Sequence, residues 1–178
     1  FQLLENNQKI KLEPGIIGAK ANNFLAPHGL KIGPDPASIG ACMIGGIVAN
    51  NASGMCCGTA QNSYQTIADI RIVLHDGTIL DTSDTQSITA FRKNQTALIQ
   101  EIENLRDQIK GNEILFNQIK NKFKIKNTTG YSINALVDYQ DPIDIIKHLM
   151  VGSEGTLAFI SSVTLKTVID EKHKSCSL

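Results

Sequence analysis

Alternating apolar positions predict two β-hairpins in this chain. Residues 67–74 place Ile70, Ile72 and Leu74 on one face, and Asp76-Gly77 turns this strand into residues 78–82. Residues 2–4 and 9–13 are extended runs on either side of an Asn6-Asn7 turn. We therefore expect a sheet with antiparallel neighbours.

Helical spacing predicts two helices, and an extended pattern predicts a strand after the second one. Apolar residues from Ile17 to Leu25 recur at helical intervals and stop before Pro27. Asp141 followed by Pro142 is typical of a helix start, and Gly152 is expected to end that helix. Residues 156–168 then have the pattern of a long strand. Strands and helices mixed in this way indicate an α+β fold, with a mixed or antiparallel sheet flanked by helices.

Residues 85–124 differ in composition from the rest of the chain, and their pattern predicts a helical insertion. Two apolar stripes at helical spacing are separated by Gly111-Asn112, in a background of glutamine, asparagine, lysine and glutamate. One interpretation is a hairpin of helices that faces a partner or a membrane. The other is an ordinary helical insertion packed on the sheet, which we favour. The stripes are Leu98, Ile102, Leu105 and Ile109, then Leu115, Ile119 and Phe123.

Residues 34–58 are the segment with the clearest candidate chemistry. They are rich in glycine, alanine, serine and asparagine, and they contain no lysine or arginine and one carboxylate. Backbone N–H groups in such a loop can bind a phosphate, and residues 43–50 could form a short buried helix whose first turn points at it. A buried turn that packs two elements together is the alternative, and composition leaves both open. Neither a P-loop nor a G-x-G-x-x-G dinucleotide motif is present.

The overall composition indicates a globular domain. The 178 residues are 42% hydrophobic and 19% charged, with 17 basic and 17 acidic side chains, which suits a globular domain and gives no sign of nucleic-acid or anionic-membrane binding. No apolar run approaches the ~20 residues of a membrane span. We expect a cytoplasmic protein.

Cysteines and histidines give no metal or catalytic signal. The four cysteines contain no C-x-x-C pair, which argues against a zinc or cluster site. Cys56 and Cys57 could form a vicinal disulfide, but we expect free buried thiols. None of the four histidines accompanies a plausible nucleophile and carboxylate, so all are expected at the surface. They are His28, His75, His148 and His173.

Two motifs in order resemble the FAD-linked oxidases of the vanillyl-alcohol oxidase type. The first is Asp35-Pro36-Ala37-Ser38, Met43-Ile44-Gly45-Gly46 and Ala49-Asn50-Asn51-Ala52-Ser53-Gly54. The second is Asn127-Thr128-Thr129-Gly130-Tyr131-Ser132-Ile133 and Gly152-Ser153-Glu154-Gly155-Thr156-Leu157. The Ala-Ser-Gly-Met-Cys-Cys-Gly form looks most like D-lactate dehydrogenases that carry an added iron–sulfur domain. The resemblance implies that residues 1–178 are the second half of an FAD-binding domain.

The resemblance also assigns FAD contacts, position by position. Pro34 and Ser38 would line the entry, and Cys42, Gly45 and Gly46 would bring backbone donors to the pyrophosphate. Asn51 and Gly54 would shape the turn beneath the isoalloxazine, and Ile67 would meet the adenine side through its backbone. Glu154 and Gly155 would precede a strand whose main chain, near Phe159, bonds the pyrimidine edge.

The implied activity is oxidation of a D-2-hydroxy acid, first of all D-lactate to pyruvate, by hydride transfer to the flavin. Substrate-binding residues and any iron–sulfur cluster would lie outside this chain, so we name no catalytic residue and no metal ligand in it. A peripheral electron-transfer partner at the inner membrane is left open. So are a non-catalytic flavin-binding or interaction module and an FAD-linked oxidase of another alcohol.

Overall fold

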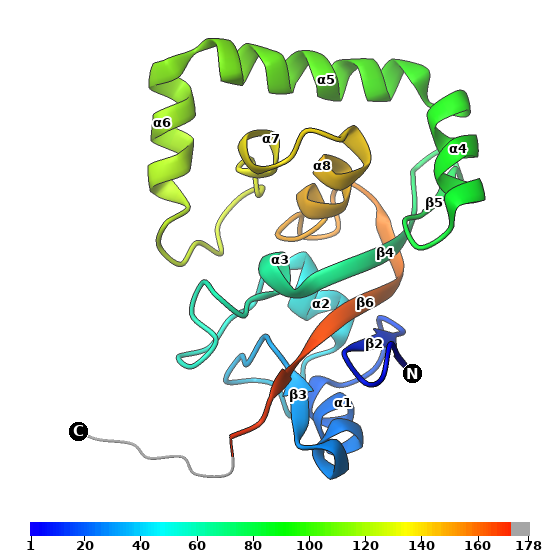
Figure 1. The fold of residues 1–178 in the computed structure, drawn as a ribbon, viewed down its shortest axis with the longest axis vertical. Coiled ribbons are helices and arrows are strands. Elements are labelled where there is room, and N and C mark those ends of the chain that lie inside the picture. The colour runs from blue at the N-terminus through cyan, green and yellow to red at the C-terminus, as the bar shows by residue number, and fades with distance from the viewer. Residues whose placement is uncertain (172–178) are drawn as a thin grey trace.

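The computed structural model describes residues 1–171 and contains one curled antiparallel sheet (Figure 1). Its path is β1 (Gln2–Leu4), β2 (Lys9–Leu12), β6 (Phe159–Ile169), β4 (Ile67–Val73) and β5 (Ile79–Asp81). A sixth strand, β3 (Leu30–Ile32), pairs with β6. Both predicted hairpins are confirmed, and the predicted strand 156–168 begins three residues late, at Phe159.

The long strand β6 organises the core because it pairs with β2, β3 and β4. Its Leu165 lies opposite Ile10 on one side and Ile67 on the other, and all three side chains are buried. Directly opposed residues share a face of an antiparallel pair. The apolar positions of the strands therefore build one continuous core.

Short helices lie beside the lower and middle parts of the sheet in Figure 1. Helix α1 (Gly18–Leu25) runs into the 3-10 turn η1 (Ala26–His28), and Gly29 ends it in the left-handed conformation with φ +68°. Helices α2 (Ile44–Ala49) and α3 (Ser63–Thr66) both contact β6. The helix predicted over residues 43–50 is thus confirmed as α2.

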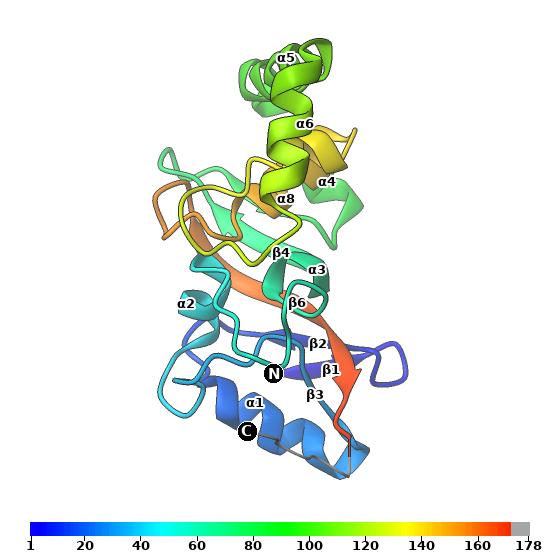
Figure 2. The ribbon, with the colours of Figure 1, turned by 90° about the vertical axis from the view of Figure 1, so that its left-hand side faces the viewer.

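Three further helices form an outer frame around α7 (Ala135–Asp138) and α8 (Pro142–Leu149). They are α4 (Thr85–Asn94), α5 (Thr96–Gly111) and α6 (Glu113–Lys122). The two predicted stripes fall on α5 and α6, whereas α4 was not expected. The expected packing on the sheet holds for α4, which contacts β5, but α5 packs on α7 and α8 (Figures 1 and 2).

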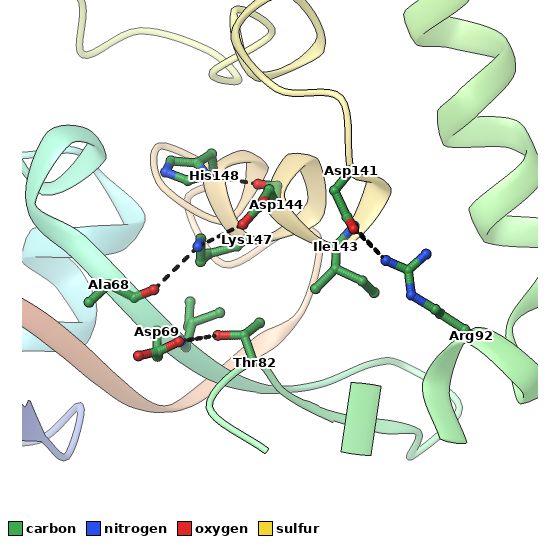
Figure 3. A network of polar contacts seen from close by, with 10 residues as sticks. Ala68, Asp69, Thr82, Arg92, Asp141, Ile143, Asp144, Lys147 and His148 are labelled. Carbon is green, nitrogen blue, oxygen red and sulfur yellow. Dashed lines mark hydrogen bonds and ion pairs between the residues drawn. The ribbon is translucent and has the colours of Figure 1, made fainter. Parts of the chain in front are cut away.

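Polar contacts hold α8 against its neighbours (Figure 3). The Asp141 carboxylate accepts the Ile143 N–H at 2.7 Å, which is the predicted N-cap, and also binds the Arg92 guanidinium at 2.6 Å. The Lys147 ammonium donates to the Ala68 carbonyl at 3.2 Å and to Asp144 at 2.9 Å. These bonds connect α8 with both α4 and β4.

Within residues 1–171, none of the helices has the length and apolar character needed to cross a bilayer.

Candidate functional site

Helix α2 is fixed at its start by the segment that follows β2. Its first-turn N–H groups on Ile44 and Gly45 donate to the carbonyls of Ile16 and Pro14, at 2.8 and 2.9 Å. A Cβ on Gly45 would lie 2.9 Å from the Pro14 Cβ, so the absence of a side chain permits this approach. Gly45 therefore allows α2 to pack closely against Pro14. Its own N–H is already bonded to the Pro14 carbonyl.

The end of α2 is where the two sequence motifs meet. The carbonyls of Val48 and Ala49 accept the N–H groups of Gly152 and Glu154, at 3.1 and 2.8 Å. Helix ends leave carbonyls without partners, and here a segment about a hundred residues away supplies the donors. The donor segment is turned back on itself, with φ +85° at Gly152 and +53° at Glu154.

A cavity of about 380 Å³ lies at this junction. Five residues that the sequence assigned to FAD contacts line it together: Gly45, Gly46, Glu154, Gly155 and Phe159. The remaining lining residues are Pro14, Ala49, Ala158 and Ile160, which sequence reasoning missed. Their small or apolar character resembles ordinary core packing, so only the fold reveals them.

The cavity wall fits a flat, partly apolar cofactor such as a flavin. A Cβ built on Gly46 would meet no other atom within 4 Å, so the missing side chain leaves open space. Phe159 presents 65% of its surface, an unusual exposure for an aromatic ring, at the start of β6. The only ionisable side chain on the wall is Glu154, whose carboxylate accepts the Asn50 amide.

A second loop crossing involves Asp35 and residues 54–57. The Asp35 carboxylate accepts N–H groups from Gly54 at 2.8 Å, Cys56 at 3.0 Å and Cys57 at 3.2 Å. A Cβ on Gly54 would lie 2.0 Å from the Asp35 carbonyl oxygen, so only glycine fits the crossing. Burial opposes the charge, but the Cys57 thiol and the three N–H donors outweigh it and hold the pKa of Asp35 below its usual range.

Six of the assigned residues do not line the cavity, and their FAD contacts remain predictions. Asn51 is buried, has φ +48°, and accepts the Tyr64 N–H at 3.2 Å, so it fixes the start of α3. Ile67 is buried where β4 begins. The other four lie in the loops before and after α2: Pro34, Ser38, Cys42 and Gly54.

Residues 126–133 connect the second motif to the first. The Ser132 hydroxyl donates to the Val151 carbonyl at 2.6 Å, and the Tyr131 and Thr156 hydroxyls lie 2.8 Å apart. The Lys126 ammonium donates to the Ser53 carbonyl at 2.5 Å. Lys126 adjoins the motif and was not singled out by the sequence analysis.

The three described cysteines, Cys42, Cys56 and Cys57, carry free thiols, as expected, and the vicinal disulfide is not formed. The expected burial holds for Cys57 but is wrong for Cys56, which is exposed in the loop after α2, and Cys42 is half-buried. Burial and the neighbouring Asp35 carboxylate raise the pKa of the Cys57 thiol. Cys176 lies outside the described residues.

One histidine prediction was wrong. His148 is only 4% exposed, because α8 packs against α5 and α7 as well as against β4 of the sheet. Its ring stacks on Tyr139 with centroids 3.9 Å apart and meets the edge of Tyr64 at 4.9 Å. His28 and His75 are exposed, as expected, and His173 lies outside the described residues.

Comparison with known proteins agrees with this architecture. The family model of the FAD binding domain matches residues 2–83. D-2-hydroxyglutarate dehydrogenase of Haemophilus influenzae is 26% identical over 97% of this chain and 18% of its own length. Mitochondrial D-lactate dehydrogenase [cytochrome] 1 of Saccharomyces cerevisiae is 25% identical over 95% of the chain and 20% of its own length.

A solved structure of alkyldihydroxyacetonephosphate synthase superposes with a TM-score of 0.53 at 18% identity, over 97% of this chain and 21% of that one. This likeness concerns the fold alone. The chain thus spans about a fifth of the length of the proteins it matches.

The fold and the family match agree on an FAD-binding domain. Residues 2–83 match the model of this domain, and the similarity of nearly the whole chain to D-2-hydroxyglutarate and D-lactate dehydrogenases is consistent with the FAD-linked oxidases, with FAD as the cofactor.

Proposed function

We propose that this chain forms one wall of the FAD site in an oxidoreductase that oxidises a D-2-hydroxy acid, with D-lactate as the first candidate. The observation that carries the proposal is the cavity between α2 and residues 154–160, where four assigned residues from two distant motifs converge with Phe159. The dehydrogenase names of the relatives support the reaction class.

The chain's own residues would bind and orient the cofactor. Gly46 would bring the backbone close to the pyrophosphate, and Gly155 would precede the start of β6, where the main chain near Phe159 would bond the pyrimidine edge of the flavin. Bound FAD supplies the hydride-accepting chemistry, and the protein supplies position and electrostatics. The general base and the substrate-binding arginines that the resemblance implies would lie elsewhere in the protein, as would any iron–sulfur cluster.

We further propose that residues 85–124 are an insertion in this domain, and that electrons leave the flavin for a partner protein. We also propose that the protein is located in the cytoplasm.

The test is anaerobic bleaching of the flavin absorbance when D-lactate is added to the purified, flavin-loaded full-length protein. We expect loss of the oxidised flavin spectrum with formation of pyruvate. A protein that retains flavin and is not bleached by any 2-hydroxy acid would be a non-catalytic flavin module. Bleaching by another alcohol alone would identify a different oxidase.

D-2-hydroxyglutarate is the second substrate candidate, because the relative with this name aligns with 97% of the chain. The same assay separates the two acids through the ratio of their kcat/KM values.

A further inference from the structure

The Lys126 side chain connects the two sequence motifs that were assigned to the cofactor. Its ammonium donates to the carbonyl of Ser53, at 2.5 Å, in the turn that follows α2. Lys126 itself directly precedes Asn127, where the second motif begins. One lysine therefore spans both segments that the FAD assignment depends on.

Positive charge is scarce in this part of the molecule. Residues 32–70 contain no lysine or arginine, and the same is true of residues 127–146. Lys147, the basic residue that follows, is engaged by Asp144 and by the Ala68 carbonyl. The carboxylates of Asp35 and Glu154 lie within the two motifs, so side-chain charge there is negative without Lys126.

The Lys126 charge is not neutralised by a carboxylate. Four ion pairs form among residues 1–171, and Lys126 belongs to none of them. An ammonium has three N–H donors, and the Ser53 carbonyl uses one. The side chain is thus fixed in position, exposed, and able to donate to an incoming anion.

We infer that Lys126 binds an anionic oxygen group of the ligand that lies against the turn at residues 51–54. This inference rests on the proposed function, which supplies two sources of that chemistry. One is the pyrophosphate of FAD, and the other is the carboxylate of the 2-hydroxy acid. Both carry negative oxygens that an ammonium recognises as a point charge.

The experiment compares Lys126→Gln with Lys124→Gln in the purified protein. Lys124 is an exposed lysine in the same loop, so it controls for general loss of charge. Affinities for FAD and for riboflavin, which lacks phosphate, are measured by flavin fluorescence. The affinity of the flavin-loaded protein for oxalate, a dicarboxylate probe, is measured by spectral titration.

Pyrophosphate binding predicts about tenfold weaker FAD binding in Lys126→Gln, with riboflavin unchanged. Carboxylate binding predicts unchanged FAD affinity and about tenfold weaker oxalate binding. Equal effects of the two variants, or no effect of Lys126→Gln on either ligand, would overturn the inference. Lys126→Met, which keeps the apolar stem, replaces Lys126→Gln if that variant unfolds at a lower temperature than wild type.

The wild-type protein tests the proposed function separately from the role of Lys126. Wild-type protein that binds no flavin contradicts the proposed function. Wild-type protein that binds flavin and is bleached, with Lys126→Gln unaffected, contradicts only the role of Lys126.

Discussion

Gly46 leaves the cavity wall bare, and this makes it the most direct residue to test. A side chain at this position would extend into open space instead of into the protein. We expect Gly46→Leu to fold normally and to bind FAD at least about tenfold more weakly, because the leucine occupies cavity space that the cofactor would fill. Flavin fluorescence titration measures the affinity, and circular dichroism checks the fold.

Gly111→Leu is the matched control, because a Cβ on Gly111 also meets nothing within 4 Å and lies at the end of α5. Equal FAD affinity in Gly46→Leu and wild type would show that the cofactor does not use this cavity.

Asp35 acts as an internal anion for the turn at residues 54–57. We expect Asp35→Asn to lower the free energy of unfolding by about 2 kcal/mol, because an amide nitrogen would face N–H donors. The carboxyl pKa is lowered from 3.8 in the folded state, so its stabilisation is present above that value and is lost as pH falls below it. Urea unfolding at neutral and acidic pH measures both effects.

Glu101→Gln, an exposed carboxylate-to-amide change on α5, should leave the urea midpoint unchanged. If Asp35→Asn is as stable as wild type at neutral pH, the carboxylate does not hold this turn.

At the scale of residues, the sequence was informative where a motif resembles a known family. It assigned Gly45, Gly46, Glu154, Gly155 and Phe159, which converge on one cavity. The roles of Asp35 and Lys126 depend on backbone groups at distant positions. Such partners follow from the path of the chain and leave no pattern of side chains in the sequence.

Among the elements, α8 carries a buried histidine that sets a pH limit on stability. Burial lowers the pKa of His148 to about 4, even though its Nδ1 lies 2.7 Å from the Asp144 carbonyl. In the unfolded chain the imidazole has its ordinary pKa of 6.5, so it takes up a proton first as pH falls. Stability from this group is full above pH 6.5 and is lost between 6.5 and 4.

We therefore expect His148→Phe to reduce the loss of stability between pH 7 and pH 4.5 by up to about 3 kcal/mol. The phenyl ring can still stack on Tyr139 but does not titrate. Guanidinium unfolding at each pH measures the change, and His75→Gln at the exposed turn is the control. An identical pH profile in His148→Phe and wild type would mean that His148 titrates normally.

Element prediction succeeded where the periodic pattern was long or a turn signal was specific. Both hairpins, α1, α2, α5, α6 and α8 were expected from the sequence. The elements β3, α3 and α7 span only three or four residues each, too few for a period to be recognised. Helix α4 has few apolar residues, and its buried side chain is Phe91 alone.

At the scale of the whole molecule, the candidate cofactor cavity is open on one side. Phe159 is 65% exposed and Met43, just before α2, is 55% exposed, so a ligand held here would contact protein on one side. We expect the isolated chain to bind FAD with a dissociation constant above about 1 µM, or weaker than about −8 kcal/mol. Isothermal titration calorimetry on residues 1–178 gives this value, and sub-micromolar binding would contradict the prediction.

The fold class was predictable because antiparallel hairpins and amphipathic helices each leave a local signal. The packing of α5 on α7 and α8 was not, since an apolar stripe does not state which surface it will cover. His148 shows the same limit, because a polar side chain on a helix was read as facing solvent.

The central place of β6 also determines when the domain can form during synthesis. Strands β2, β3 and β4 pair with β6, and the end of α2 is closed by residues 152–154. A nascent chain that has reached residue 100 therefore holds unpaired strands and the apolar side of α2 without their partners. Pairings this distant in sequence form slowly, so the emerging chain exposes strand edges and apolar surface until β6 has been synthesised.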